Sequence, residues 1–330
     1  MMFAWSERYH SLIIGENNGN FIKSHPLTFI NSTDIRPLTP LEKNILNKVQ
    51  KSVELGEGIF LLFSDRMFRK KVVFTKDKIL EFKITKDGVK ITTFLKGRIQ
   101  GVDKKNLIKA NRKRLKNLTK FSLSIVKNAF KKFGKEAVIS FSGGKDSLVL
   151  SHLLRKYNIP NVYIDTGMEF PETYNYIQEL KKMGWKIFVI KPKFSWKTLE
   201  KKFGKPSYSN RWCSKFLKFE PFKKFLLSNF GKKSVLVFSA ERRWESISRI
   251  NQPYIKQQKH IENEIVVQPI LDWFELDVWI YIWTKKLYVN PLYEKIPRNG
   301  CWVCPFGWKY RKFLLKYSHP ELLTTHHISP

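Results

Sequence analysis

Residues 138–147 read VISFSGGKDS, and this stretch decides the fold of the chain. A short apolar run that stops at two adjacent glycines is typical of a buried strand followed by a turn. Glycine lets a backbone approach a phosphate closely, and the N–H groups and positive dipole end of a following helix hold the anion. Ser142 and Ser147 add hydroxyl donors, and Lys145 adds a positive charge. The Gly-x-x-x-x-Gly-Lys spacing of a Walker A loop is absent, so we predict a phosphate-binding loop of another kind.

Strand and helix patterns alternate on both sides of this loop. Buried-type strands are predicted at 137–141, 161–165, 186–190 and 234–240, with helices at 118–133, 146–157 and 171–183. This alternation predicts an α/β domain whose parallel sheet is covered by helices on both faces.

The first 110 residues predict a smaller α+β domain. Thr39, Pro40 and Glu42 indicate a helix start, with Thr as N-cap, Pro in the first helical position and Glu at the capping-box position. Strands are predicted at 59–63, 71–74, 79–84 and 89–95, and the basic stretch 103–116 as a linker or the start of a helix. We therefore divide the chain into a small basic domain, 1–110, and a catalytic domain with the phosphate loop, 111–330.

The loop matches the Ser-Gly-Gly-x-Asp-Ser signature of the PP-loop ATP pyrophosphatases through Ser142, Gly143, Gly144, Lys145, Asp146 and Ser147. The chain therefore resembles this superfamily of adenine nucleotide alpha hydrolases, whose domain is a Rossmann-like, HUP-type parallel sheet. The resemblance implies that ATP binds with Mg²⁺, that a substrate oxygen is adenylated and that pyrophosphate is released. It also implies that the glycines and serines hold the pyrophosphate portion and that Asp146 helps to position Mg²⁺.

Later segments resemble the phosphoadenosine-phosphosulfate (PAPS) reductase-like branch of this superfamily. They are Asp165–Gly167 with Phe170–Thr173, Arg211–Ser214 with Lys218, Glu241–Arg249, Pro269–Trp273 with Asp277–Trp279, Asn290–Tyr293, and Gly300–Cys304. The resemblance implies nucleotide contacts at the carboxyl edge of the sheet and in the arginine motif, from Asp165, Thr166, Gly167, Arg242, Glu245 and Ser246. It implies that Lys145 and Arg249 offset charge that develops in the transition state.

The chain has three cysteines, Cys213, Cys301 and Cys304, and an odd count with one Cys-x-x-Cys does not indicate a secreted disulfide framework. The set is similar to that of cluster-dependent tRNA thiolases of this superfamily. That similarity implies a 4Fe–4S cluster on three thiolates, with Cys213 also among the catalytic residues. Zinc with His326 or His327 as fourth ligand is one alternative, and a redox-inert set is another. True reductases have a nucleophilic cysteine near the C-terminus, and this sequence has none after Cys304, which favours ATP-dependent adenylation.

The charge predicts a polyanionic partner. Lys and Arg number 61 against 28 Asp and Glu, a net charge of +33. RNA is the most natural partner, unless the whole proteome is rich in lysine. Archaeal-type members of this branch carry an N-terminal PUA-like RNA-binding module, which residues 32–40 and the following strands resemble. Phosphate contacts are then expected from Arg66, Arg69, Lys70, Lys71 and 104–116.

Three functional hypotheses follow. The first is ATP-dependent adenylation for sulfur transfer to RNA, similar to tRNA thiolation, with a sulfur-donor protein as a further partner. The second is a reductase or sulfotransferase that acts on PAPS, and the third is a non-catalytic RNA-binding protein on an inherited nucleotide-binding fold. No apolar run approaches the roughly 18 residues of a membrane span, and no signal-peptide pattern is present. We therefore expect a cytoplasmic protein with no membrane partner.

Overall fold

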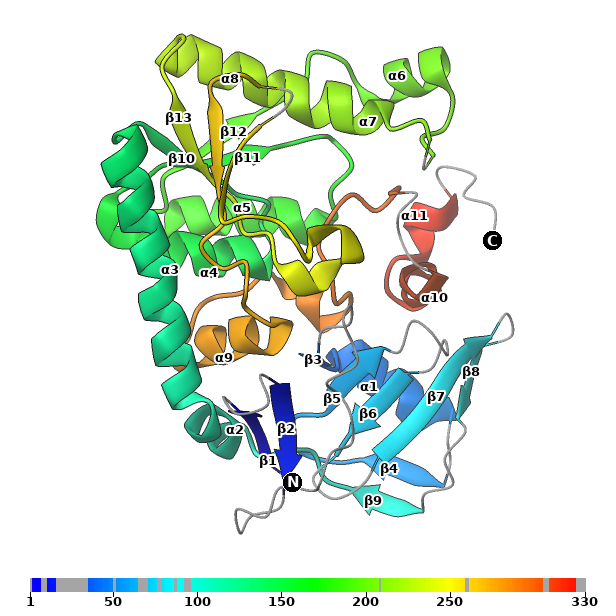
Figure 1. The fold of residues 1–330 in the computed structure, drawn as a ribbon. Helices are drawn as coiled ribbons and strands as arrows, with labels where there is room; N and C mark the ends of the chain where they lie inside the picture. The colour runs from blue at the N-terminus through cyan, green and yellow to red at the C-terminus, as the bar shows by residue number, and fades with distance from the viewer. Residues whose placement is uncertain are drawn as a thin grey trace. The chain divides into compact units, whose positions relative to one another are not determined.

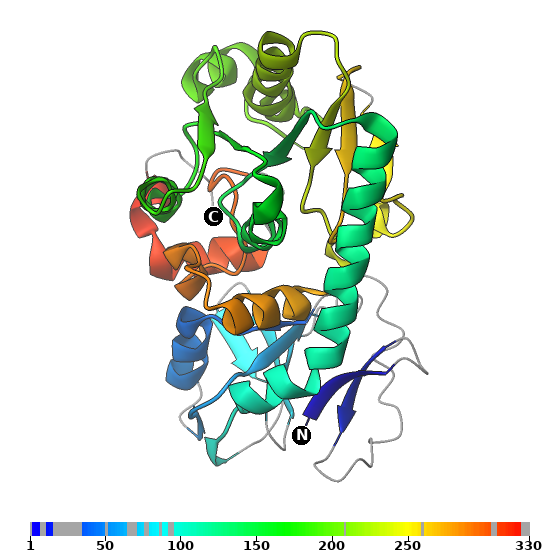
Figure 2. The same cartoon turned by 90° about the vertical axis from the view of Figure 1, so that its left-hand side faces the viewer.

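The computed structural model describes residues 2–6, 11–15, 35–49, 52–64, 71–75, 79–85, 88–91, 96–207, 209–258, 261–304 and 309–324. The chain forms two compact units, whose elements are drawn in Figures 1 and 2. The first unit consists of 1–120, 242–252 and 271–288, and the second of 121–241, 253–270 and 289–330. The units are therefore not the two consecutive stretches 1–110 and 111–330. Whether 1–110 forms a domain of its own stays a prediction.

The second unit contains a six-stranded sheet in the order β12-β11-β10-β13-β15-β14. Its strands are β10 (Ala137–Ser140), β11 (Asn161–Ile164), β12 (Ile187–Ile190), β13 (Val235–Phe238), β14 (Ile255–Gln257) and β15 (Glu264–Val267). Neighbouring strands from β12 to β15 are parallel, and β14 pairs with β15 in the antiparallel direction. The predicted parallel α/β fold of the Rossmann-like, HUP type is thus confirmed, with two further strands, β14 and β15, that the sequence analysis does not identify.

Helices pack on both faces of this sheet. The helices of this unit are α4 (Lys145–Leu154), α5 (Pro171–Lys182), α6 (Trp196–Phe203), α7 (Trp212–Ser214), α8 (Glu220–Phe230), α10 (Lys309–Ser318) and α11 (Pro320–Thr324). Successive side chains of a strand point to opposite faces. On β11, Val162 accordingly packs with Leu226 of α8, whereas Tyr163 packs with Ile177 of α5. This confirms the predicted cover on both faces.

Helix boundaries differ from the predictions at three places. The predicted helix 146–157 ends as α4 at Leu154, continues as the 3₁₀ turn η2 (Arg155–Tyr157) and stops at Asn158, whose φ is +54°. Helix α3 (Arg112–Phe133) begins before residue 118 and runs from the first unit into the second. The basic stretch 103–116 contains α2 (Lys104–Ala110) and the first residues of α3, and Asp103 caps α2 by accepting the Asn106 N–H at 2.8 Å.

The first unit contains a five-stranded antiparallel sheet in the order β3-β5-β6-β7-β8, and two two-stranded pairs, β1-β2 and β4-β9. The N-terminal elements are β1 (Met2–Ser6), β2 (Ser11–Gly15), β3 (Arg36–Pro37), α1 (Pro40–Val49), β4 (Val53–Leu55), β5 (Leu61–Ser64), β6 (Lys71–Phe74), β7 (Ile79–Thr85), β8 (Gly88–Ile91) and β9 (Gly97–Ile99). The predicted capping box is confirmed: the Thr39 N–H donates to Glu42 Oε2 at 2.8 Å, and the Glu42 N–H donates to Thr39 Oγ1 at 3.1 Å. Arg36 adds a buried pair with Glu42, with N–O distances of 2.6 and 2.7 Å.

Two later segments complete the first unit. They hold the 3₁₀ turns η4 (Arg243–Glu245) and η5 (Ile247–Arg249) and the helix α9 (Glu275–Lys285). Helix α9 contacts β3 and α2. Arg114 binds the Asp277 carboxylate through two nitrogens, at 2.8 and 2.7 Å. A boundary at residue 110 separates α9 from β3 and α2, which is the physical reason that the compact units differ from the linear division.

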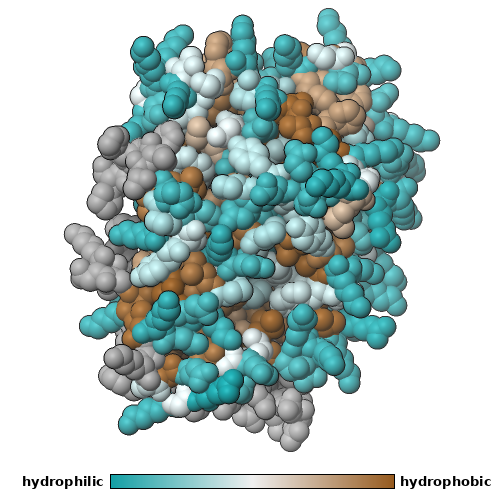
Figure 3. Space-filling model, turned by 180° about the vertical axis from the view of Figure 1, so that it is seen from behind, coloured by the Kyte–Doolittle hydropathy of each residue, from teal (hydrophilic) through white to brown (hydrophobic). Residues whose placement is uncertain are grey.

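The proposed RNA contacts in the N-terminal region lie partly outside the described residues. Arg66, Arg69 and Lys70 lie there, as do residues 92–95 of the predicted strand 89–95. The PUA-like layout stays a prediction. In the described part of the chain, no helix combines the length and the apolar composition needed to cross a bilayer. Hydrophilic side chains project over most of the face seen in Figure 3, with apolar patches between them.

Candidate active site at the phosphate loop

The phosphate loop joins the end of β10 to the start of α4, as the sequence predicts. Gly143 has a φ of +70°, and a Cβ there would lie 3.2 Å from Thr173 Cγ2. Gly144 is the N-cap of α4 and has an ordinary φ of −90°. A Cβ on Gly144 would lie 3.1 Å from the Tyr293 hydroxyl and 3.2 Å from Ser142 Oγ. The first glycine is therefore required by its backbone conformation and the second by lack of space.

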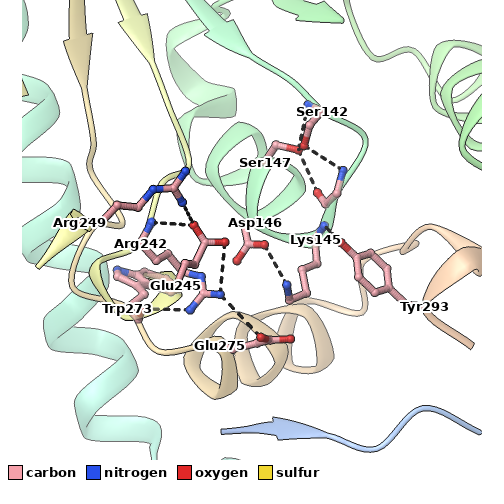
Figure 4. Close-up of polar contacts among 11 residues, drawn as sticks. Ser142, Lys145, Asp146, Ser147, Arg242, Glu245, Arg249, Trp273, Glu275 and Tyr293 are labelled. Carbon is pink, nitrogen blue, oxygen red and sulfur yellow. Dashed lines mark hydrogen bonds and ion pairs between the residues drawn. The ribbon is translucent and has the colours of Figure 1, made fainter. Parts of the chain in front are cut away.

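The two predicted loop serines hydrogen-bond within the loop (Figure 4). Ser147 Oγ donates to the Gly144 carbonyl at 2.9 Å and lies 3.2 Å from Ser142 Oγ. The Ser142 N–H donates to Ser147 Oγ, and the Gly144 N–H to Ser142 Oγ, both at 3.3 Å. These hydroxyls hold the turn in shape, and their contact with a phosphate stays a prediction.

Three residues from the segment 290–299 support the loop from outside. Asn290 Nδ2 donates to the Gly143 carbonyl at 3.2 Å, and Asn299 Nδ2 donates to the Ser142 carbonyl at 2.9 Å. The hydroxyl of Tyr293 accepts the N–H at the first helical position of α4 at 2.9 Å. Carbonyl and amide groups on both sides of the glycines are thus fixed by side chains about 150 residues away in sequence, which pre-organises the loop.

Lys145 and Asp146 form an ion pair at the start of α4. The Lys145 Nζ lies 2.9 Å from Asp146 Oδ2, and the two side chains are 4% and 17% exposed. Lys145 Nζ also lies 5.5 Å from the centre of the Tyr293 ring. The two predicted catalytic groups of the loop are therefore held together, as Figure 4 shows.

The arginine motif belongs to the first compact unit. Arg242 is 1% exposed, and its guanidinium lies 3.8 Å from Glu245 Oε1 and 3.7 Å from Glu275 Oε2 (Figure 4). Glu245 also pairs with Arg249. Ser246 Oγ lies 3.0 Å from Ser248 Oγ. Arg242 is thus fully buried between two carboxylates, and the roles predicted for Arg242, Glu245, Ser246 and Arg249 at a nucleotide stay predictions.

The predicted Asp165–Gly167 turn follows β11, at the carboxyl edge of the sheet. Asp165 Oδ1 accepts the Gly167 N–H at 3.0 Å, which closes the turn. Thr166 is 4% exposed, and its hydroxyl donates to Glu169 Oε1 at 2.7 Å. The Thr166 N–H donates to Glu169 Oε2 at 3.0 Å. Thr166 therefore faces a buried carboxylate, and a contact with nucleotide from this turn stays a prediction.

Thr166 and Glu169 both contact one of the cysteines. Cys301 Sγ lies 3.6 Å from Thr166 Oγ1 and 3.7 Å from Glu169 Oε1. Burial raises the pKa of the Cys301 thiol, and the nearby Lys218 ammonium acts in the opposite direction. The pKa of Lys218 is raised, chiefly by the charge of Cys301 and further by Glu169 and Cys304, while burial of the ammonium opposes the rise.

Lys218, Cys301 and Cys304 line one pocket, and the charge of Cys213 contributes least to the raised pKa of Lys218. Each is half-buried and has a free thiol. In the described residues, no three His, Cys, Asp or Glu side chains come close enough together to hold a metal ion. As described, the three cysteines do not come together in the way that the predicted 4Fe–4S or zinc site on Cys213, Cys301 and Cys304 requires. His326 and His327 lie outside the described residues.

Sequence reasoning missed three residues of this region: Glu169, Asn299 and Arg311. Arg311 donates through Nη2 to the Cys301 carbonyl, and its pKa is lowered, chiefly by burial. Glu169 and Asn299 are each adjacent in sequence to a matched motif, Phe170–Thr173 and Gly300–Cys304, and this adjacency could have marked them as site residues. Arg311 gives no local signal, because only the fold of α10 brings it to the Cys-x-x-Cys segment.

The comparisons with known proteins identify the family. The model of the phosphoadenosine phosphosulfate reductase domain matches residues 136–306, which is more than half of the chain. The chain belongs to the PAPS reductase family. This region contains the phosphate loop, the Asp165–Gly167 turn and all three cysteines, so the family resemblance of these motifs is confirmed.

Relatives of this PAPS reductase family chain include proteins with and without an assigned reaction. An uncharacterized protein of Methanocaldococcus jannaschii is 37% identical over 204 residues, covering 60% of this chain and 42% of its own length. The chain thus spans less than half of that relative. An adenosine 5′-phosphosulfate reductase of Bacillus cytotoxicus is 30% identical over 193 residues, which are 56% of this chain and 80% of the relative.

Two solved structures align with this chain at low sequence identity. The PAPS reductase of Candida auris in a phosphate complex is 20% identical with a TM-score of 0.46, covering 58% of this chain and 96% of that one. The U34-tRNA thiolase of Methanococcus maripaludis with its 4Fe–4S cluster is 13% identical with a TM-score of 0.43, covering 66% and 76%.

Proposed function

We propose that this chain binds ATP at residues 142–147, cleaves it to AMP and pyrophosphate, and adenylates a substrate oxygen for sulfur transfer to RNA. The observation that carries the proposal is the phosphate loop. Gly143 has a left-handed backbone and Gly144 has little space for a Cβ, while three distant side chains hold the loop carbonyls and the first helical N–H. A rigid loop at the N-terminus of α4 suits the phosphates of a nucleotide, because the helix dipole and backbone N–H groups favour anions there.

The Lys145–Asp146 pair supplies both charges that the reaction needs. A carboxylate suits Mg²⁺, which arrives with the ATP phosphates, and an ammonium suits the phosphate oxygens. Binding of magnesium-ATP would replace the internal ion pair by two new ones, so each group leaves its partner only when the ligand is present. Arg249 would offset charge at the transferring phosphoryl group, and Ser142 and Ser147 would bind the pyrophosphate portion.

The sulfur-transfer part of the proposal rests on the thiols near the loop. Asn299 connects the two regions, because it donates to the Ser142 carbonyl and stands two residues before Cys301. Cys301 and Cys304 line one pocket together with Lys218, and the Lys218 ammonium opposes the rise that burial causes in the pKa of the Cys301 thiol. Since these residues do not form a metal-ligating group, no step is assigned to an iron–sulfur cluster.

RNA is the proposed substrate because of charge. The net charge of +33 favours a polyanion. Residues 1–110 would contribute RNA contacts, including the helical basic stretch that contains α2. A cytoplasmic location and a sulfur-donor protein remain parts of this proposal.

A sulfonucleotide reductase is the second candidate, favoured by the 30% identity to an adenosine 5′-phosphosulfate reductase. Titration calorimetry with magnesium-ATP, PAPS and adenosine 5′-phosphosulfate separates the two candidates. The proposal expects ATP to bind most tightly. Tighter binding of a sulfonucleotide, with sulfite release in the presence of a thiol, would establish the reductase instead.

Pyrophosphate release tests the enzymatic proposal directly. Magnesium-ATP and bulk tRNA are added to the full chain, and released pyrophosphate is measured against time. Asp146→Asn keeps the shape of the side chain but removes its charge, and should lower the rate at least tenfold with a higher Mg²⁺ requirement. Glu179→Gln, on the exposed face of α5, is the matched control and should leave the rate unchanged. No release from the folded wild-type chain with any RNA would leave the reductase and the non-catalytic RNA-binding hypotheses.

A further inference from the structure

A pocket of about 230 Å³ lies beside the cysteines in the second unit. The residues of its wall that bear on its chemistry are Lys218, Arg298, Asn299, Cys301, Cys304 and Arg311. Arg298 is exposed, so the pocket is accessible from solvent, whereas Arg311 is only 9% exposed. The pocket thus extends from the surface to a buried guanidinium.

The charge of the wall selects the ligand. Three cationic side chains line the pocket, and no Asp or Glu is among the described residues that line it. Burial is the chief cause that lowers the pKa of Arg311, and the charge of Arg298 adds to the lowering. A guanidinium fork matches oxyanions through paired N–H donors, and an ammonium adds a point charge. A small anion with several oxygens would satisfy these donors, whereas hydrosulfide has no oxygen for them.

Two thiols share this wall because of a local turn. The Cys304 N–H donates to the Cys301 carbonyl at 3.2 Å, which closes the Cys-x-x-Cys segment. Arg311 donates to the same carbonyl and fixes the segment from behind. Cys301 Sγ is already in contact with Thr166 Oγ1 and Glu169 Oε1 at 3.6 and 3.7 Å. Within the described residues no such contact is found for Cys304 Sγ, and Cys304 lines the pocket, so Cys304 is the candidate thiol for reaction with a ligand there.

We propose that this pocket binds a small sulfur oxyanion of the thiosulfate class, from which Cys304 takes a sulfur atom. The Cys304 thiolate attacks the outer, sulfane sulfur, and a Cys–S–S bond forms as the S–S bond of thiosulfate breaks. Sulfite leaves with the electron pair of that bond, so no external oxidant or reductant is needed. The role as sulfur donor rests on the proposed function, whereas the binding and the persulfide product do not.

The position of Asn299 gives this step a place in the reaction. Asn299 lines the pocket and also donates to the Ser142 carbonyl of the phosphate loop at 2.9 Å. Only Asn299 would then need to lie between a persulfide on Cys304 and the loop that activates the acceptor. A donor protein is then not required for the first sulfur, although the sequence alone predicts one.

The experiment uses the full chain, thiosulfate and no nucleotide or RNA. After incubation, the thiols are alkylated, the peptides are analysed by mass spectrometry, and free sulfite is quantified. We expect a mass gain of one sulfur atom on Cys304, an equal amount of sulfite, and at least fivefold inhibition by excess sulfate, which has the oxygens but no sulfane sulfur. Cys304→Ser should lose the gain, whereas Glu179→Gln should keep it.

A second pair of variants tests the pocket without disturbing its buried residues. Arg298→Ala should lower the rate of sulfite release at least fivefold, and Lys312→Ala, an exposed cation on α10 outside the pocket wall, should leave it unchanged. Equal labelling of all three cysteines, or labelling that sulfate does not reduce, would overturn the proposal. Because ATP is absent, persulfide formation together with failed pyrophosphate release would sink only the proposed function.

Discussion

Substitution of Gly144 by alanine separates close packing at the phosphate loop from backbone strain. Its φ of −90° and ψ of 163° are open to any residue, so alanine meets no conformational penalty there. The added methyl would lie 3.1 Å from the Tyr293 hydroxyl, 3.2 Å from Ser142 Oγ and 3.6 Å from Asn299 Cβ. The first two contacts are tighter than ordinary packing, so both hydroxyls must move by a few tenths of an ångström.

The displacement weakens two hydrogen bonds, from the Lys145 N–H to Tyr293 at 2.9 Å and from the Gly144 N–H to Ser142 at 3.3 Å. At about 0.5–1.5 kcal/mol each, we expect the free energy of unfolding to fall by about 1–3 kcal/mol. The methyl also covers the surface that a phosphate approaches. Loss of one charge-assisted hydrogen bond, about 1.5–3 kcal/mol, corresponds to a roughly 10- to 150-fold weaker binding of magnesium-ATP.

Isothermal titration calorimetry with magnesium-ATP measures this effect, and urea unfolding measures the change in stability. Gly184→Ala is the matched control: its φ is +85°, and nothing lies within 4 Å of the added Cβ. That variant should lose a similar free energy of unfolding, about 1–2 kcal/mol, through the left-handed backbone alone. It should bind ATP like the wild type. Wild-type ATP affinity in a folded Gly144→Ala protein would refute the placement of the phosphates at this loop.

Three further predictions concern stability. Asp277→Asn breaks the buried bidentate pair with Arg114, whose side chains are 4% and 11% exposed, and should lower the free energy of unfolding by about 3–5 kcal/mol in urea. Burial raises the pKa of Glu172, but hydrogen bonds from Lys295 and His319 lower it overall. The Glu172 carboxylate therefore stabilises the fold at a pH above its unfolded pKa, and this stabilisation is lost as the pH falls. Glu172→Gln should make the free energy of unfolding fall less steeply on acidification. Burial raises the pKa of Glu264 from 4.5 to about 7, so stability should fall as the pH rises between these values, and Glu264→Gln should abolish that fall.

Each of these has a result that contradicts it. An Asp277→Asn variant with wild-type stability would mean that the pair contributes no net free energy. An unchanged acid limb in Glu172→Gln would place the acid-sensitive group elsewhere. If the stability of wild type and Glu264→Gln changed in parallel between pH 4.5 and 7, Glu264 would be ionised normally in the fold.

The strands and helices around the phosphate loop were predictable because their signals are local. Val138–Phe141 is a short run, apolar except for Ser140, that leads through Ser142 to two glycines, and the structure has β10 and α4 there. Strand β14 was missed because it has only three residues, Ile255–Gln257, two of them polar. Strand β15 was missed because a glutamate, Glu264, opens its short apolar run; the fold buries this residue to 5% exposure.

The site was predictable as a set of motifs but not as a set of contacts. The Asn290–Tyr293 motif was found from the sequence, yet its contact with the loop spans about 150 residues and is set by the sheet order. Arg242 looks like an anion ligand in the sequence and is buried between two carboxylates in the fold. Residue type and spacing cannot distinguish these two uses of an arginine, because both require the same guanidinium.

The discontinuous make-up of the first unit has a consequence for synthesis. Its strands are translated first, but the unit is completed by 242–252 and 271–288, which emerge much later. On the ribosome the early strands must therefore wait, with their apolar side chains uncovered, until most of the second unit has been made. The nascent chain should accordingly depend most on chaperones before residue 288 is added. A fragment that ends before residue 288 should be insoluble and should not yield a folded first unit.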